Sequence, residues 1–552
     1  MEFFKKKPDI ILLAVLALCV FIFVQLINGM LSGIRGGDGI SYVMLAKSIA
    51  TGHGFADINV PGAPAHTQYP PLLPLLLAPF FYLFGFNFTW MQLVVAGFGV
   101  ATVWMVKSYF EEEAGQGMAL ALAFLVGTNF YFLFFVKEIM TEVPYAFLSL
   151  LALHWFGRYE RRGLSARLLV VVSALTAAAY MMRMIGITLW AAMAAALLYG
   201  AVSGRGEKAA WGKKLILFGA LAILPFAAWS IRGSIYSHGV ATYQSIFMQA
   251  DYYARDSGGL AAGPLAGRFA KNILYYYGAV ARTIFSSSEA KDAARGPVLS
   301  VLTFIFFVPA FVGFVSEAWR KRSVREFYMF FYFGLLSVWP VYGSGDARRY
   351  VVPVLPFIYW YFLAGVRLLS SIGRAGARAP GRGLAGAVLA AFVVLAALNL
   401  FEIRDVLTPR AAGRFLRVAG TMPARLAAVS AEPAPDALGA GYFAKSVPCY
   451  GNYLSAAERL KAMTGPADVI MTRKPELVSL ITGGFAVRFP YTADGAAMLG
   501  FMDDMKVSYI LLDGCYREAG EYVAPVILGN EGRFTVLSNE RDGTAIVRFK
   551  RN

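Results

Sequence analysis

The sequence predicts an α-helical polytopic membrane protein with about eleven spans, interfacial helices and a C-terminal extracytoplasmic α/β domain. Of its 552 residues, 58% are apolar and 15% are charged, whereas soluble domains carry roughly 25% charged residues. Apolar runs recur as far as residue 401, and beyond it short apolar runs alternate with helical patterns. This composition excludes a soluble enzyme, a disordered chain and a secreted disulfide scaffold.

The apolar runs give the predicted spans, because a helix needs about 20 mostly apolar residues to cross a bilayer. The shorter run 71–86, bracketed by prolines, is predicted to be an interfacial or re-entrant helix. The first run follows Lys5–Lys7 as in a signal peptide, but no convincing small-residue cleavage signal follows it, so we interpret it as a retained span. The predicted spans lie near 10–27, 88–108, 117–136, 140–157, 166–182, 184–201, 214–231, 297–315, 327–342, 350–366 and 384–401.

The basic residues predict the orientation in the membrane. Lys5–Lys7 place the N-terminus in the cytoplasm, and every later predicted cytoplasmic turn except 109–116 is basic. The net charge of +17 therefore reflects topology and does not indicate nucleic acid. The segments 28–87, 232–296 and 402–552 are then extracytoplasmic. We expect a bacterial inner-membrane protein with a periplasmic C-terminal domain.

The chain divides into a membrane domain, 1–401, and an α/β domain, 402–552. Within the latter, apolar runs at 468–472, 507–512 and 544–549 are typical of strands, and 455–463 and 476–482 are typical of helices. It contains no Gly-rich phosphate loop, so we predict no nucleotide site there. Cys449 and Cys515 could pair in an oxidising compartment, but their spacing leaves the pairing open.

Asp38 is the most informative polar residue of the first external loop. The spacing of Ile40, Val43, Met44 and Lys47 predicts a short amphipathic helix on the membrane surface. An Asp directly before a helix is a favoured N-cap. A carboxylate held at the membrane surface could equally act as a general base. The residues by themselves leave both interpretations open.

Other charged residues gather at the outer ends of the predicted spans. Glu138 and Glu142 open the fourth span, where the helix dipole favours carboxylates. Arg183 lies between two spans and could snorkel to the interface. Arg348, Arg349 and Tyr350 precede the tenth span on the outer side, against the charge rule, and an anionic lipid phosphate would explain the two arginines. Arg232, after the seventh span, is a weaker phosphate candidate.

Metal binding finds no support in the sequence, although a divalent metal is left open. His53 and His66 show no paired spacing with each other or with the acidic residues, and no zinc motif is present. We therefore interpret both as free interfacial histidines and predict no cofactor.

The first loop resembles that of a known family. Asp38 is followed by a predicted helix, by Gly52-His-Gly-Phe55 and by Gln68-Tyr-Pro-Pro-Leu-Leu-Pro74. This order resembles the polytopic glycosyltransferases of the C superfamily that use polyprenyl-phosphate-linked sugars, the protein O-mannosyltransferases and lipid A aminoarabinose transferases. The similarity extends over roughly 10–400 and into the external domain.

The resemblance implies a role for several residues. It makes Asp38 the catalytic base, assigns Glu142 to an acidic position that orients the acceptor or a basic neighbour, and supports Arg349-Tyr350 at the donor phosphate. Protein O-mannosyltransferases carry Asp-Glu where this chain has Asp38-Gly39, which argues against protein Ser/Thr as the acceptor. Further candidates for donor or acceptor contacts are Glu138, His66 and Tyr69.

The sequence thus predicts an inverting glycosyltransferase that moves a sugar from a polyprenyl-phosphate donor to an acceptor hydroxyl on the extracytoplasmic face. We expect Arg183, together with Arg348 and Arg349, to stabilise the departing phosphate. The acceptor is a glycolipid, a polysaccharide or a protein, and its identity and that of the sugar stay open. One alternative is a lipid or sugar transporter or flippase, which predicts internal repeats and ionisable residues at mid-span. Another is a non-catalytic assembly subunit that displays the C-terminal domain.

Overall fold

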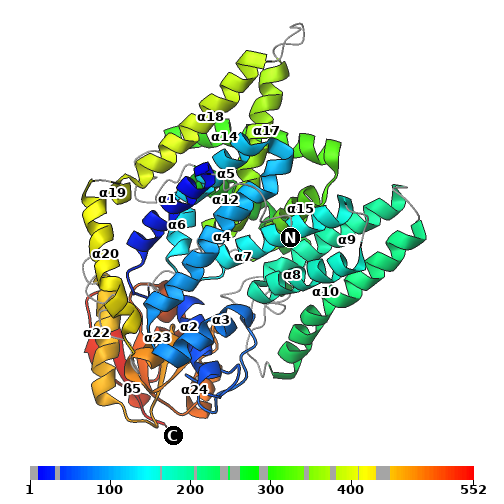
Figure 1. The fold of residues 1–552 in the computed structure, drawn as a ribbon. Helices are drawn as coiled ribbons and strands as arrows, with labels where there is room; N and C mark the ends of the chain where they lie inside the picture. Colours follow the sequence, from blue (N-terminus) through cyan, green and yellow to red (C-terminus); the bar gives the residue numbers. More distant parts are fainter. Residues whose placement is uncertain are drawn as a thin grey trace.

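A computed structural model gives the arrangement of the chain (Figure 1). It is mostly helical, with one small sheet near the C-terminus. Parts of the predicted cytoplasmic turns, 162–164, 204–207 and 373–380, lie outside the described residues. The described residues are 10–31, 38–161, 165–203, 208–236, 247–248, 262–284, 296–340, 347–372, 381–407, 409–429 and 448–551.

A helix lies at each predicted span, as the apolar runs indicated. The N-terminal part contains α1 (Ile10–Leu26), α2 (Asp38–Ala50), α3 (Leu72–Phe84), α4 (Phe88–Ala114), α5 (Gln116–Thr128), α6 (Phe130–Val136), α7 (Glu142–Arg161), α8 (Ala166–Met182), α9 (Ile187–Val202) and α10 (Lys208–Tyr236). The remainder of the bundle contains α12 (Ala262–Ile284), α14 (Gly296–Lys321), α15 (Val324–Val338), α16 (Arg348–Val351), α17 (Leu355–Ile372), α18 (Gly381–Glu402), α19 (Arg404–Leu407) and α20 (Pro409–Ala427).

Among the described residues, four helices are long and apolar enough to cross a membrane, or five if the bent pair α5 and α6 counts as one span. Shorter apolar helices, among them α1, α3 and α8, accompany them. These lengths and the composition identify an integral membrane protein. The count of about eleven spans stays a prediction.

The predicted span 117–136 is bent and consists of two helices, α5 and α6. The axes of α5 and α6 differ by 62°, because Asn129 adopts an extended backbone and its side chain caps α6, accepting from the amides of Tyr131 and Phe132. The Asn129 amide nitrogen also donates to the carbonyl of Thr283 on α12 and to the hydroxyl of Tyr359. A side chain that caps one helix and is held by two others fixes the break.

The predicted helix after Asp38 is present as α2, but it is buried within the protein and not exposed as an amphipathic surface helix. Residues 39–46 and Ser48 are all buried, because α3 and, from the C-terminal domain, α23 (Pro475–Thr482) pack against the helix. Gly39 permits this close packing: a Cβ atom there would lie 3.2 Å from the carbonyl oxygen of Ile139. The first turn of α2 is thereby held against the segment that precedes α7.

The C-terminal unit is a five-stranded mixed sheet with strand order β2-β1-β3-β5-β4. The strands β1, β2 and β3 are parallel, and β5 is antiparallel to β3 and β4. The predicted strands correspond to β1, β3 and β5, whereas β2 and β4 were not predicted. The elements are α22 (Pro448–Met463), β1 (Val469–Thr472), α23 (Pro475–Thr482), β2 (Phe485–Arg488), α24 (Gly495–Asp504), β3 (Val507–Leu512), α25 (Ala524–Leu528), β4 (Phe534–Asn539) and β5 (Ala545–Phe549).

The C-terminal unit lies at one end of the helical bundle, beside α2 (Figure 1). The backbone amide of Ala486 on β2 donates to the carbonyl of Asn59 at 2.7 Å, and the Asn59 side chain donates back at 3.2 Å. The preceding helix α20 packs against α1 and α4, and its carbonyl at Leu426 accepts from Trp90. The first loop is therefore enclosed between the bundle and the sheet. The division at residue 402 stays a prediction.

Candidate active site

A cavity of about 420 Å³ opens beside the start of α2. One part of its wall is charged and consists of Asp38, Arg183 and Arg349. Most of the remaining wall is apolar or aromatic, with contributions from the end of α8, the start of α9, α10 and α15. A cavity with charged groups beside an extended apolar wall suits an amphiphilic ligand with an anionic head. The apolar and aromatic lining includes Tyr180, Met182, Met184, Ile185, Ile187, Phe226, Phe247, Met248, Leu335, Leu336 and Trp339.

Asp38 is the first residue of α2, and both of its carboxylate oxygens bind side chains. Oδ1 accepts a hydrogen bond from the Tyr69 hydroxyl at 2.9 Å, and Oδ2 accepts one from Arg349 Nη2 at 2.6 Å. The Asp38 side chain is 21% exposed. The carboxylate is therefore fixed in orientation, within reach of a ligand in the cavity.

The pKa of Asp38 lies below its usual range. Burial acts to raise the pKa, but the guanidinium of Arg349, the hydrogen bonds from Arg349 and Tyr69, and the charge of Arg183 together lower it. Asp38 is consequently an ionised carboxylate at neutral pH, able to accept a proton.

Glu142 joins the two arginines of the site. Its Oε1 atom accepts hydrogen bonds from Arg183 Nη1 at 2.6 Å and from Arg349 Nε at 2.7 Å. The Glu142 side chain is fully buried at the N-terminus of α7, where the helix dipole favours a negative charge. Asp38, Arg349, Glu142 and Arg183 thus form one continuous chain of ion pairs, with two charges of each sign.

The neighbours of these residues hold the arginines in place. Arg183 Nη1 also donates to the Thr141 hydroxyl at 2.9 Å. The Tyr350 ring lies 5.0 Å from the Arg183 guanidinium and 5.7 Å from that of Arg349. Both distances suit cation–π attraction. Tyr350 therefore belongs to the site by contact with both guanidinium groups.

Arg348 does not reach the site. Its Nη1 atom donates to the Tyr131 hydroxyl at 2.6 Å, and its guanidinium lies 4.6 Å from the centre of that ring. Arg348 and Arg349 are consecutive residues of the short helix α16, and neighbouring helical residues face different directions. The structure therefore separates the two arginines that the sequence paired at a donor phosphate.

His66 supports the loop that carries Tyr69. Its Nε2 atom accepts from the backbone amide of Tyr69 at 2.7 Å, and its Nδ1 atom lies 2.7 Å from Asp57 Oδ1. Because an amide N–H can only donate, the Nε2 atom is unprotonated, and Nδ1 carries the hydrogen that Asp57 accepts. His66 thus acts on the site through Tyr69.

Arg232 and Glu138 lie outside the charged network. Arg232 donates to the carbonyls of His66 and Phe55, so it braces the same loop as His66. Glu138 is buried, with Oε1 3.9 Å from the ammonium of Lys137. In the part of the chain that the structure describes, no group of three or more His, Cys, Asp or Glu residues could hold a metal ion.

Sequence reasoning missed several residues of the cavity. Tyr42, one turn after Asp38, lines the wall and packs edge-on against Tyr69. Thr141 also lines it and binds Arg183. The sequence could have indicated Thr141, because it directly precedes Glu142. It gave no such indication for Tyr42, because the apolar pattern around Tyr42 is equally typical of a buried core residue.

No protein-family model matches the sequence, and the search of curated proteins finds no relative. The fold nevertheless matches those of solved structures over almost the whole chain. It is similar to ArnT from Cupriavidus metallidurans in the apo state, with 13% identity, a TM-score of 0.51, and coverage of 98% of this chain and 97% of that chain.

Two further solved structures have the same fold. ArnT from Cupriavidus metallidurans bound to undecaprenyl phosphate matches with 14% identity and a TM-score of 0.50, over 98% of this chain and 97% of that chain. The Archaeoglobus fulgidus oligosaccharyltransferase tethered with an acceptor peptide matches with 12% identity and a TM-score of 0.51, over 99% of this chain and 74% of that one. At these identities the likeness concerns the fold.

Proposed function

We propose that this protein transfers a sugar from a polyprenyl-phosphate-linked donor to an acceptor hydroxyl on the extracytoplasmic face of the membrane. The observation that carries the proposal is the ion-paired chain from Asp38 through Arg349 and Glu142 to Arg183, at a cavity that is otherwise largely apolar. The apolar wall suits a polyprenyl chain, and the guanidinium groups suit its phosphate. Among the proteins with a similar fold, ArnT binds undecaprenyl phosphate and the archaeal oligosaccharyltransferase binds a dolichol-phosphate.

In the proposed reaction the acceptor oxygen attacks the anomeric carbon of the donor sugar. The bond from that carbon to the phosphate oxygen breaks, and its electron pair leaves with polyprenyl phosphate. The acceptor hydroxyl proton passes to Asp38 as the new bond forms. A single displacement of this kind inverts the anomeric configuration, and no nucleotide or redox partner is needed.

The arginines supply the charge that the leaving group requires. Negative charge grows on the departing phosphate, and Arg349 and Arg183 stabilise it if they face the phosphate before the reaction begins. Arg349 binds Asp38 and Glu142 through different nitrogens, so it can turn toward the donor while Glu142 retains it. When Arg349 turns away from Asp38, the lost contact raises the pKa of the Asp38 carboxylate and makes it a better base.

A transfer assay tests the proposal. The purified full-length protein is incubated with undecaprenyl-phosphate-linked hexoses or pentoses and with an extract of envelope glycolipids, and the products are identified by mass spectrometry. We expect release of undecaprenyl phosphate together with a glycolipid heavier by one sugar. A transporter predicts movement of the intact donor between vesicle leaflets with no new glycosidic product, and that outcome would overturn the proposal.

A further inference from the structure

The carboxyl edge of the C-terminal sheet has the topology of a binding crevice. From β1 the chain passes through α23 to β2 on one side, and the following parallel strand, β3, lies on the other side of β1. The strand order therefore reverses between β1 and β3. In open α/β sheets, ligands bind outside the carboxyl ends of the strands at such a point.

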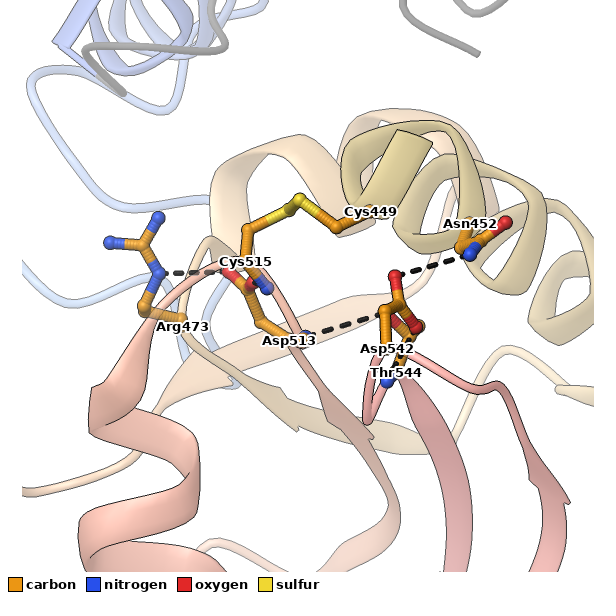
Figure 2. The surroundings of a disulfide bond; sticks show 8 residues. Cys449, Asn452, Arg473, Asp513, Cys515, Asp542 and Thr544 are labelled. Carbon is orange, nitrogen blue, oxygen red and sulfur yellow. Dashed lines mark hydrogen bonds and ion pairs between the residues drawn. A yellow bond between two sulfur atoms is a disulfide. The ribbon is translucent and has the colours of Figure 1, made fainter. Parts of the chain in front are cut away.

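Two basic residues follow β1 at this edge, and an acidic residue follows β3. Arg473 Nε donates to Asp513 Oδ2 at 2.9 Å, and the guanidinium lies 3.4 Å from the centre of the Tyr516 ring. Figure 2 shows the other two guanidinium nitrogens of Arg473 directed away from Asp513. Of these, Nη2 is buried and has no hydrogen-bond partner among the described residues. A buried donor of this kind indicates a missing acceptor.

Lys474 adds a second positive charge. It is 7% exposed, and its ammonium lies 5.3 Å from the Tyr450 ring and 5.9 Å from the Tyr516 ring. Lys474 is the N-cap of α23, with Pro475 in the first turn. The positive end of a helix dipole therefore adds to the two side chains, and the three together favour an anion.

Several charges and rings face Lys474. Burial, together with the charges of Arg473 and Arg488, lowers the pKa of Lys474 to about 7, although Asp513 and Asp38 act to raise it. An anion at this edge would therefore raise the pKa of Lys474 and draw a proton onto it near neutral pH. The groups that act on the charge of Lys474 or lie near its ammonium come from α22, the ends of β1, β2 and β3, and the start of α2. They are Tyr450, Arg473, Arg488, Asp513, Tyr516 and Asp38.

The surroundings hold this edge in a fixed position. The Cys449–Cys515 disulfide, with its Cα atoms 5.4 Å apart, joins α22 to the loop after β3 (Figure 2). The amide of Cys515 donates to Asp513 Oδ1 at 2.7 Å, so the carboxylate that orients Arg473 is itself oriented. The pairing that the sequence left open is present, and it braces the basic edge.

The same edge adjoins the candidate active site. The helix α23 packs against α2, and Asp38, at the start of α2, is close enough to act on the charge of Lys474. The donor phosphate is already assigned to Arg183 and Arg349 in the cavity. A second basic group, carried by the C-terminal domain, would meet the molecule that brings the hydroxyl to Asp38.

We propose that Arg473, Lys474 and the N-terminus of α23 bind a phosphate group carried by the acceptor. The proposal rests on the proposed function, because it takes Asp38 as the point where the acceptor hydroxyl arrives. It narrows the acceptor to phosphate-bearing glycolipids or glycans, and it gives the C-terminal domain a part in acceptor recognition.

Calorimetry with inorganic phosphate as the probe tests this subsite. The full-length protein is first saturated with undecaprenyl phosphate, so that the donor site is filled, and phosphate is then titrated in. We expect Arg473→Gln to raise the Kd for phosphate about tenfold or more. The matched control is Arg533→Gln, since Arg533 also combines an ion pair, to Asp503 at 2.7 Å, with an aromatic ring, Phe549 at 4.6 Å. The control should bind phosphate as the wild type does.

The source of the phosphate is distinguished by titrating undecaprenyl phosphate alone. If the wild type and Arg473→Gln bind undecaprenyl phosphate equally well, the phosphate at this subsite belongs to the acceptor. Weaker binding of undecaprenyl phosphate by Arg473→Gln would assign the subsite to the donor and overturn the proposal. An unchanged Kd for inorganic phosphate would overturn it too. Lys474→Gln should also weaken phosphate binding, whereas Lys474→Arg, which keeps the positive charge, should bind phosphate as the wild type does. This second pair of variants tests the subsite even if Arg473→Gln does not fold. Asp38→Asn should bind inorganic phosphate as the wild type does. A failure of the transfer assay would therefore not change the outcome of the phosphate titration, and the two proposals can be judged separately.

Discussion

Arg349 Nη2 lies 2.6 Å from Asp38 Oδ2, although 311 residues separate the two in the chain. The contact joins the first external loop to the start of the tenth predicted span. Arg349 also binds the buried carboxylate of Glu142, so one side chain connects the proposed base with the proposed phosphate site.

Asp38→Asn should abolish sugar transfer while leaving expression and donor binding near the wild-type level. Asn keeps the size and the hydrogen-bonding oxygen, but it cannot take a proton, and general-base catalysis typically contributes about 10²–10⁴-fold. Turnover of a polyprenyl-phosphate sugar by the purified variant is the measurement. Asp494→Asn is the control, because Asp494 caps α24 through the amides of Ala496 and Ala497, and Asn caps a helix about equally well. Near-wild-type turnover in Asp38→Asn would move the base elsewhere, and Glu142 would be examined next.

Arg349→Lys should raise the apparent Michaelis constant for the donor. Lysine keeps the charge but cannot contact two carboxylates and a phosphate with a planar fork, and a lost charge-assisted contact costs roughly 1.5–3 kcal/mol. We therefore expect kcat/KM to fall about tenfold or more by that figure. Arg348→Ala is the contrast, because Arg348 binds Tyr131 instead. Arg348→Ala should lower the thermal stability and leave the Michaelis constant for the donor unchanged. A raised Michaelis constant in Arg348→Ala together with an unchanged one in Arg349→Lys would contradict the assignment of Arg349.

Glu142→Gln should destabilise the protein and reduce turnover. The change leaves the guanidinium groups of Arg183 and Arg349 close together in a buried site without the carboxylate between them. Breaking a buried ion pair by removing one partner costs about 3–5 kcal/mol. Thermal unfolding of the detergent-solubilised protein measures the loss, with Glu138→Gln, outside the network, as the control. Equal melting temperatures for the two variants would show that Glu142 does not hold the arginines.

The contribution of Lys474 to the free energy of unfolding should rise with pH. The pKa of Lys474 falls from 10.5 to about 7 on folding, so between these values the unfolded chain binds a proton that the folded chain does not. Stability then increases with pH across this window, by up to about 1.4 kcal/mol per pH unit. The difference in melting temperature between the wild type and Lys474→Met isolates this residue, since other groups cancel. We expect the difference to shift in favour of the wild type from pH 7 to 9, and a constant difference would contradict the low pKa.

The predicted orientation can be tested by cysteine labelling. Ser455 lies on α22 of the C-terminal domain and is exposed, and Arg320 is exposed near the end of α14, in a predicted cytoplasmic turn. With Cys19 buried, an impermeant thiol reagent on intact cells should label Ser455→Cys and leave Arg320→Cys unlabelled until the cells are lysed. Labelling of Arg320→Cys alone would invert the topology and remove the site from the extracytoplasmic face.

The sequence by itself determined the membrane class, the helices at the predicted spans and the strands β1, β3 and β5, because these depend on the spacing of apolar residues along the chain. It also singled out Asp38, Glu142, Arg183 and Arg349, each a charged residue at the end of an apolar run. It did not predict α12 or α20. It could not predict the break at Asn129, where a side-chain cap interrupts an unbroken apolar run.

Only the tertiary structure decided which of these residues meet. Arg348 and Arg349 are equivalent in sequence, yet helix geometry sends one to Tyr131 and the other to Asp38 and Glu142. The pattern of α2 is that of a surface helix, but α3 and α23 pack against it and its residues 39–46 are buried. The basic edge at Arg473 likewise acquires its neighbours from α22 and from the loop after β3. The physical reason is the same in each case: local spacing fixes an element, whereas contacts between residues hundreds of positions apart depend on how the elements pack.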